Sequence, residues 1–132
     1  MNVAGLIVHE AEGAVDEVLR RLQSAFAERG IVPLLRVDHA ATAIAIGIPL
    51  APLTLFVFGN PQVGSPLMAA HPSLGIDLPL KLLVWEEGSA KVGFNDPAWL
   101  AERHGGDASA ASVATMRALL DALARQAAGG TL

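Results

Sequence analysis

Few side chains in this sequence are suited to acid–base chemistry, and three of them suggest one site. Lys81 lies between Leu80 and Leu82 in a strand-like run whose other members are apolar, and lysine is rarely buried without a partner. His39 directly follows the end of another predicted strand, where an imidazole can act as a general base. If Asp96 neutralises Lys81, the pair would orient or polarise a substrate while His39 takes its proton. The alternative is structural, with Lys81 and Asp96 forming a half-buried ion pair.

Proline-containing pairs offer a structural explanation for several other polar residues. In Asn60-Pro61, Ser65-Pro66 and Asp96-Pro97 the first side chain can cap a helix, and proline can occupy the first helical position. His104-Gly105 suits the end of a helix, where an imidazole lies near the negative end of the dipole. The candidate ligand-binding residues are His39, Asn60, Lys81, Asn95 and Asp96. For Asn60 and Asp96, helix capping is the alternative role.

A hairpin is predicted between the runs Leu80–Glu86 and Lys91–Asn95. A two-residue Gly-Ser loop suits a type II′ turn, so Glu87 is expected opposite Ala90. Counting outward matches two oppositely charged pairs and brings large apolar residues together. The expected partners are Glu86 with Lys91, Trp85 with Val92, Leu83 with Phe94, and Lys81 with Asp96.

The remaining pattern indicates an α+β domain that spans residues 1–132. Helical spacing of apolar residues predicts one helix from about Val15 to Phe26, followed by a cap at Gly30, and a last helix over Ser109–Ala127. Short apolar runs predict strands at Val3–Val8, Ile31–Asp38 and Leu53–Phe58, the last buried on both faces, and His39–Gly47 is interpreted as a short helix.

Composition excludes several classes of function. The chain has 132 residues, no cysteine and a formal charge of −4; disulfides and thiolate chemistry are therefore excluded, and a nucleic acid partner, which needs a basic face, is not expected. His9 and His71 form no metal-binding motif with His39, so no metal site is predicted, and no cofactor is identified.

Residues 40–76 contain no Asp, Glu, Lys or Arg. Glycine and proline interrupt this stretch too often for a membrane-spanning helix, so we expect no membrane partner and a covered, self-associating surface instead. The first residues lack the features of a secretory leader, which favours a cytoplasmic location.

Four segments carry a resemblance to a known family: VDHAA at 37–41, FGNPQVGSPLM at 58–68, DLPLKLLVWE at 77–86 and FNDPAWLAERHG at 94–105. In this combination and order they resemble the bacterial and archaeal family catalogued as domain of unknown function 302. The resemblance implies a two-layer α+β fold in the TATA-binding-protein-like order of strand, helix, four strands and helix, with a largely antiparallel sheet of about five strands and helices on one face. The matching residues are His39, Asn60, Pro61, Gly64, Leu67, Met68, Asp77, Pro79, Lys81, Trp85, Asn95, Asp96, Pro97 and His104.

Two functions remain open at this stage. The first is a homodimeric module that binds a small-molecule ligand or another partner, favoured by the missing catalytic motif and the uncharged stretch. The alternative is an enzyme acting on a small molecule, with His39 as base and with Lys81 and Asp96 beside the substrate. The alternative requires these three residues to converge on one pocket.

Overall fold

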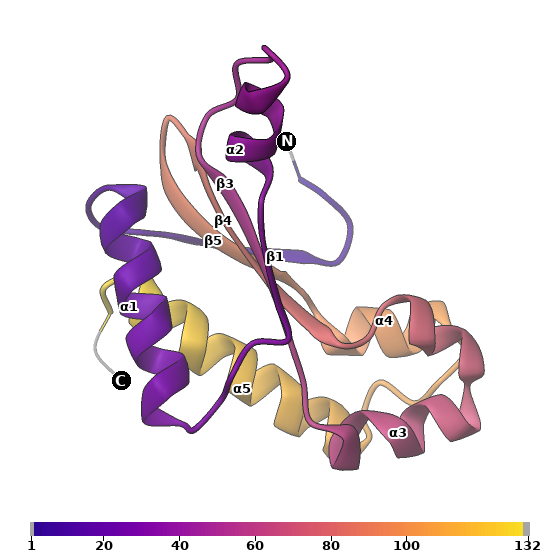
Figure 1. Ribbon diagram of the computed structural model, residues 1–132. Helices are drawn as coiled ribbons and strands as arrows, with labels where there is room; N and C mark the ends of the chain where they lie inside the picture. Colours follow the sequence, from indigo (N-terminus) through magenta and orange to yellow (C-terminus); the bar gives the residue numbers. More distant parts are fainter. Residues whose placement is uncertain (1, 131–132) are drawn as a thin grey trace.

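The computed structural model describes residues 2–130 (Figure 1). The elements, in chain order, are β1 (Leu6–Glu10), α1 (Val15–Glu28), β2 (Leu35–Asp38), α2 (His39–Ala45), β3 (Leu53–Phe58), α3 (Pro61–Ala70), the 3₁₀ helix η1 (Pro72–Ile76), β4 (Leu80–Glu87), β5 (Ser89–Asn95), α4 (Pro97–Arg103) and α5 (Ala111–Ala127).

All five strands form one antiparallel sheet in the order β1-β5-β4-β3-β2. Helices α1 and α5 lie side by side and cover one face, α3 and α4 lie beyond one end of the sheet, and α2 lies beyond the other (Figure 1). The predicted α+β fold, with its strand-helix-four strands-helix core, is confirmed; α2, α3, η1 and α4 are short additions to it.

The core forms between the inner face of the sheet and the apolar stripes of α1 and α5. Val18 and Leu22 of α1 and Leu120 and Leu123 of α5 are buried, at the spacing that puts residues on one helical face. Asp16 and Glu17 lie in the first turn of α1, where the helix dipole favours negative charge. These helices therefore begin and end close to where the periodicity predicts.

The hairpin register differs from the prediction by one residue. Trp85 lies opposite Lys91 and Glu86 lies opposite Ala90. The turn is centred on Gly88 alone, whose φ of 77° is in the left-handed region, and Glu87 pairs with Ser89 across it. The predicted partners, which assume a two-residue loop, are therefore wrong. Lys91 of β5 does meet an opposite charge, but its partner is Glu10 of β1, at 3.5 Å, instead of Glu86.

In the observed register, the valines of the hairpin face the helices and Trp85 lies on the opposite face of the sheet. Val84 and Val92 lie opposite each other and are both buried under the helices. Trp85 is on the other face, and its ring lies over Gly93, where an added Cβ would be 2.9 Å from ring carbons. Glycine is therefore required at position 93 because the indole occupies the space of a side chain.

The outer face of the sheet is the one opposite α1 and α5, and it carries apolar residues beside Glu10, Lys81, Lys91 and Asn95. Its apolar residues are half-buried in the central strands, while Val8 and Leu35 on the two edge strands are 43% and 54% exposed. We use "outer face" for the apolar residues on this side: Val8, Leu35, Val37, Leu53, Leu55, Val57, Leu83 and Trp85. Leu53–Phe58 is thus fully buried on its inner side only, rather than on both faces as expected.

Two edge strands and one helix have different limits from those predicted. The first two strands begin at Leu6 and Leu35, later than expected, because residues 4–5 form a turn and the chain bends at residue 34. Pro66 lies inside α3 instead of starting a helix. No helix within residues 2–130 is both long and apolar enough to cross a membrane.

Candidate functional site

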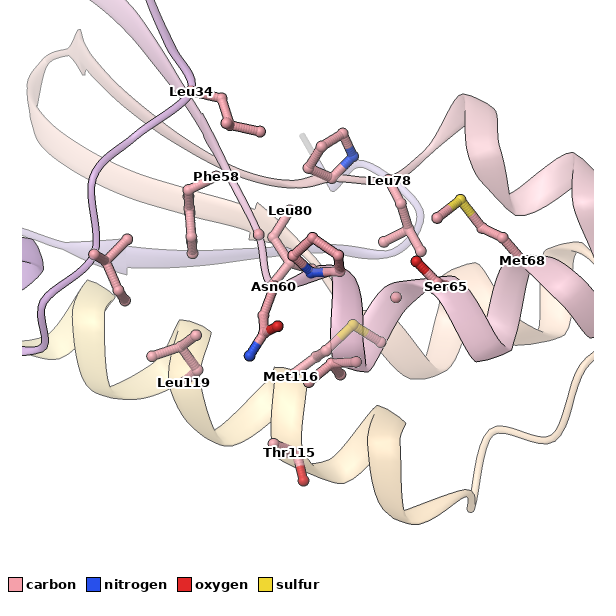
Figure 2. A pocket seen from close by; sticks show the side chains of 16 residues that line it. Leu34, Phe58, Asn60, Ser65, Met68, Leu78, Leu80, Thr115, Met116 and Leu119 are labelled. Atoms are coloured by element: carbon pink, nitrogen blue, oxygen red, sulfur yellow. The ribbon is translucent and has the colours of Figure 1, made fainter.

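An apolar pocket of about 550 Å³ lies at the α3 end of the sheet (Figure 2). Ligand pockets usually lie between 300 and 1,000 Å³, so this one has room for a small organic molecule. Its walls come from the loop before β2, the end of β3, α3, the start of β4, and α5. They are formed by Ile31, Leu34, Phe58, Gly59, Asn60, Pro61, Val63, Gly64, Ser65, Met68, Leu78, Pro79, Leu80, Thr115, Met116 and Leu119.

Asn60 is the sequence-predicted residue that the structure places in this pocket. Its Oδ1 accepts the backbone N–H of Gln62 at 2.9 Å, so it caps α3 as predicted. Its amide nitrogen points toward α5 in Figure 2 and makes no hydrogen bond to another described residue. Asn60 therefore caps α3 with one end of its amide, while the other end faces the cavity.

The structure does not pair Lys81 with Asp96. The Lys81 ammonium donates to the carbonyl oxygens of Asp77 and Pro79, at 3.0 and 3.1 Å. Asp96 caps α4 through the N–H of Ala98, at 2.9 Å, and its other oxygen is 3.1 Å from Arg117. The predicted ion pair is wrong because it depended on the register that the Gly88 turn shifts by one residue.

Lys81 nevertheless lies in an unusual electrostatic environment. Burial lowers the pKa of its ammonium group, and the negative charge of Asp77 opposes that shift only in part. Asn95 lines the same small cavity as Lys81 and Asp77, and its own residue surface is exposed. These two candidates are therefore neighbours at the α4 end of the sheet.

His39 is remote from the other candidates. It is the exposed first residue of α2, and Asp38 before it pairs with Thr54, which pairs with Val84. Lys81 is three residues further along β4, or about 10 Å at 3.3 Å per residue, and two strands away. The convergence that the enzyme alternative requires is absent.

A polar cluster that the sequence analysis did not assemble lies between η1 and the end of α4. Asp77 Oδ2 is 2.5 Å from His104 Nε2 and 2.7 Å from Arg103, and Ser73 Oγ is 2.7 Å from His104 Nδ1. Burial alone would raise the pKa of Asp77, but hydrogen bonds and positive charge from His104 and Arg103 outweigh it and lower that pKa. His104 also ends α4 before Gly105, whose φ is 78°, as the sequence predicts.

No group of histidine, aspartate or glutamate side chains among residues 2–130 is arranged to hold a metal ion.

Sequence reasoning assigned no ligand-binding role to the residues that line the apolar pocket, apart from Asn60. Met68 and Met116 are the most useful missed signals, because methionine often fills irregular or adaptable apolar surfaces. They are 48 positions apart, and no periodic pattern connects them. Their proximity depends on how α3 packs beside α5.

Together these features describe a two-layer α+β domain with one open sheet face and an apolar pocket at one end. The chain belongs to the family described as "Domain of unknown function DUF302", whose sequence model matches residues 7–125. A crystal structure of an uncharacterised conserved DUF302 protein from Bacillus stearothermophilus has the same fold. Its TM-score is 0.81 at 20% identity, with 95% of this chain and 99% of that chain covered.

Curated relatives come from Brucella. The chain is 44% identical over 103 residues to "Fluoride-specific ion channel FluC 1" of Brucella suis biovar 1 and to the protein of that name in Brucella abortus biovar 1. The matches cover 76% of this chain but only 41% and 38% of those proteins. The chain thus spans about two fifths of the length of these relatives, and their names do not define its function.

Proposed function

We propose that this domain binds a small, uncharged and largely apolar molecule in the pocket between α3, the start of β4 and α5. The observation that supports it most is the pocket itself, a volume of about 550 Å³ whose lining residues include no charged side chain. Transfer of apolar surface into such a site is favourable by roughly 25 cal/mol per Å² of surface removed from water.

The polar groups of the pocket indicate where a ligand would be oriented. Thr115 already donates its hydroxyl to the carbonyl of Ala111, at 3.0 Å. The free amide N–H groups of Asn60 face the cavity (Figure 2) and are donors. A ligand with an apolar body and a neutral hydrogen-bond acceptor, such as a carbonyl oxygen, fits this arrangement.

Titration with the neutral, lipophilic dye Nile red tests ligand binding. The variant Gly64→Leu would occupy the cavity, and the helix can accept it, because a Cβ at Gly64 meets only Leu78 and Met68 at ordinary contact distances of 3.7 and 3.8 Å. Affinity is expected to fall at least about tenfold, equivalent to about 1.4 kcal/mol. Gln62→Leu is the matched control, since it adds the same side chain to α3 at an exposed position outside the pocket.

Equal dye binding by the natural chain and Gly64→Leu would refute this location. Native mass spectrometry of freshly purified protein adds a test that needs no dye: a co-purifying molecule should be retained by Gln62→Leu and lost from Gly64→Leu. Asn60→Ser keeps a capping oxygen and removes the amide donor. It should weaken binding of a carbonyl-containing ligand by about 3- to 10-fold, the range of one hydrogen bond.

The second part of the proposal is a homodimer that buries the outer face of the sheet. This face carries a contiguous set of apolar side chains in β3 and β4, with exposed Val8 and Leu35 at its two edges. Exposed apolar patches of this kind mark interaction surfaces, and a second copy offers the same apolar surface in return. Such self-complementary contacts are the usual basis of two-fold dimers.

Sedimentation velocity across a micromolar concentration series tests the dimer. Leu55→Lys places a charge at the centre of the outer face and should give a monomer, whereas Ile44→Lys, at a 60% exposed position in α2, should not. A natural chain that sediments as a monomer at every concentration would contradict this part of the proposal. A cytoplasmic location remains part of the same proposal.

The names of the Brucella relatives suggest fluoride as an alternative ligand. The pocket offers it no positive charge among the described lining residues, and an anion transferred to such a site would lose its hydration without an ionic partner. Sodium fluoride is therefore expected to leave Nile red binding unchanged. Displacement of the dye by fluoride would instead favour fluoride over a neutral apolar molecule as the ligand.

A further inference from the structure

We propose that Ser73, His104 and Asp77 form a nucleophilic triad that transfers the acyl group of a carboxylic ester. The inference is separate from ligand binding in the apolar pocket, because none of the three residues lines that pocket. It rests on three side chains joined in the order that nucleophilic catalysis requires.

The hydrogen bonds define a consistent proton arrangement. Asp77 can only accept when ionised, so His104 Nε2, at 2.5 Å, carries the hydrogen. In the neutral ring Nδ1 is then an acceptor, and it receives the Ser73 hydroxyl at 2.7 Å. A nucleophile hydrogen-bonded to a base, and a base oriented by a third group, is the general signature of an activated serine. The two ring nitrogens are exchanged relative to the familiar serine protease arrangement, but their tasks are the same.

The exposures of the three side chains suit nucleophilic catalysis. The His104 side chain is 8% exposed and the Asp77 side chain 16%, so the imidazole is held between its partners. Ser73 lies on the exposed 3₁₀ helix η1, where a substrate carbonyl can approach its oxygen. The reacting atom is therefore accessible while its base is protected.

Arg103 supplies a positive charge beside the triad. Its NH1 donates to Asp77 at 2.7 Å, its side chain is 48% exposed, and its other N–H groups make no hydrogen bond within residues 2–130. Arg103 thus lies at the Asp77 end of the triad, where its charge keeps the carboxylate ionised as the hydrogen-bond acceptor of His104.

The reaction balances with water as the only co-reactant. Ser73 Oγ forms a bond to the ester carbonyl carbon, and its proton moves to His104 Nδ1. The bond from that carbon to the alkoxy oxygen then breaks, and His104 returns the proton to the leaving alcohol. A water molecule repeats the sequence on the acylated serine, releasing the carboxylic acid and restoring Ser73.

An alkyl fluorophosphonate tests the nucleophile directly. Attack by Ser73 would form a phosphorus–oxygen bond and release fluoride, and peptide mass spectrometry would locate the adduct. Ser89 of the same chain is the internal control, since it is an exposed serine whose hydroxyl donates to the carboxylate of Glu10, at 2.6 Å, instead of to an imidazole. We expect Ser73 to be labelled at least about 100-fold faster than Ser89, the lower limit for a positioned general base.

Variants distinguish a catalytic base from a merely structural one. His104→Gln should slow labelling of Ser73 at least about 100-fold, and Ser89→Ala should leave it unchanged. Labelling at Ser73 that is absent, equal to that at Ser89, or unaltered in a folded His104→Gln variant would overturn the proposal. The comparison of Ser73 with Ser89 is made within the natural chain, so it holds even if His104→Gln does not fold.

Discussion

Asp96 and Arg117 should be energetically coupled, and Lys81 should not be coupled to either. Arg117 lies 3.1 Å from Asp96 and 2.9 Å from Asp121, and its guanidinium group lies 5.8 Å from the centre of the Phe94 ring. The interaction therefore connects the start of α4 to α5 over the inner face of β5. Asp96→Asn removes its charge while keeping an oxygen that can cap α4.

The expected magnitude follows from burial. The Asp96 side chain is 25% exposed and that of Arg117 40%, so solvent still screens the pair. Exposed ion pairs contribute about 0.2–1 kcal/mol, and we expect the Asp96–Arg117 coupling in the upper half of that range. Arg117→Met also loses the contacts with Asp121 and Phe94, but a double-mutant cycle cancels those losses.

Urea unfolding followed by tryptophan fluorescence measures the coupling from the two single variants and the double variant. A second cycle with Lys81→Met and Asp96→Asn is the control, and these changes should add within about 0.5 kcal/mol, as independent sites do. The reasoning fails if Asp96 couples to Lys81 beyond that limit, or if Asp96 and Arg117 are additive within error.

Two further predictions concern acid stability and the hairpin turn. In the fold, hydrogen bonds and positive charge from His104 and Arg103 lower the pKa of Asp77 despite its burial. The ionised Asp77 therefore contributes fully to the free energy of unfolding above about pH 4. That contribution is lost as the pH falls through the folded-state pKa. Asp77→Asn should flatten the acid side of a stability–pH curve measured by urea unfolding, and an unchanged slope below pH 4 would contradict this. Gly88→Ala should cost about 1–2 kcal/mol, because alanine is strained at a φ of 77° while nothing lies within 4 Å of the added Cβ. Gly88→Asn should cost less, since asparagine tolerates this conformation better, and equal losses for the two variants would argue against backbone strain.

The fold could be predicted because it depends on local patterns that agree with one another. The apolar stripe from Val15 to Phe26 sits on one helical face, and Gly30 ends that segment with a positive φ. The strand Leu53–Phe58 begins and ends where predicted. Each of these features is decided within a few residues, and tertiary packing reinforces them.

The candidate site could be predicted only where a residue acts on its immediate neighbours. Asn60 and Asp96 cap the helices that follow them, as their proline pairs indicate. The Ser73–His104 contact joins residues 31 positions apart, and the apolar pocket joins α3 to α5. Such proximity is produced by packing, and no spacing in the sequence encodes it.

One turn residue therefore decided which residues Lys81 and Asp96 meet. Because side chains alternate between the faces of a strand, a one-residue shift exchanges every cross-strand partner. Because of the Gly88 turn, Asp96 does not lie opposite Lys81, and its carboxylate pairs with Arg117 instead. Gly93 is the sequence feature that indicates the observed register. A glycine inside a strand often marks the close approach of another group, and here that group is the Trp85 ring. Placing the indole over Gly93 requires the two residues to share one face of the sheet, which the predicted pairing of Trp85 with Val92 does not allow. The Lys81–Asp96 pair, which depended on that predicted register, was therefore incompatible with the packing of the largest side chain in the hairpin.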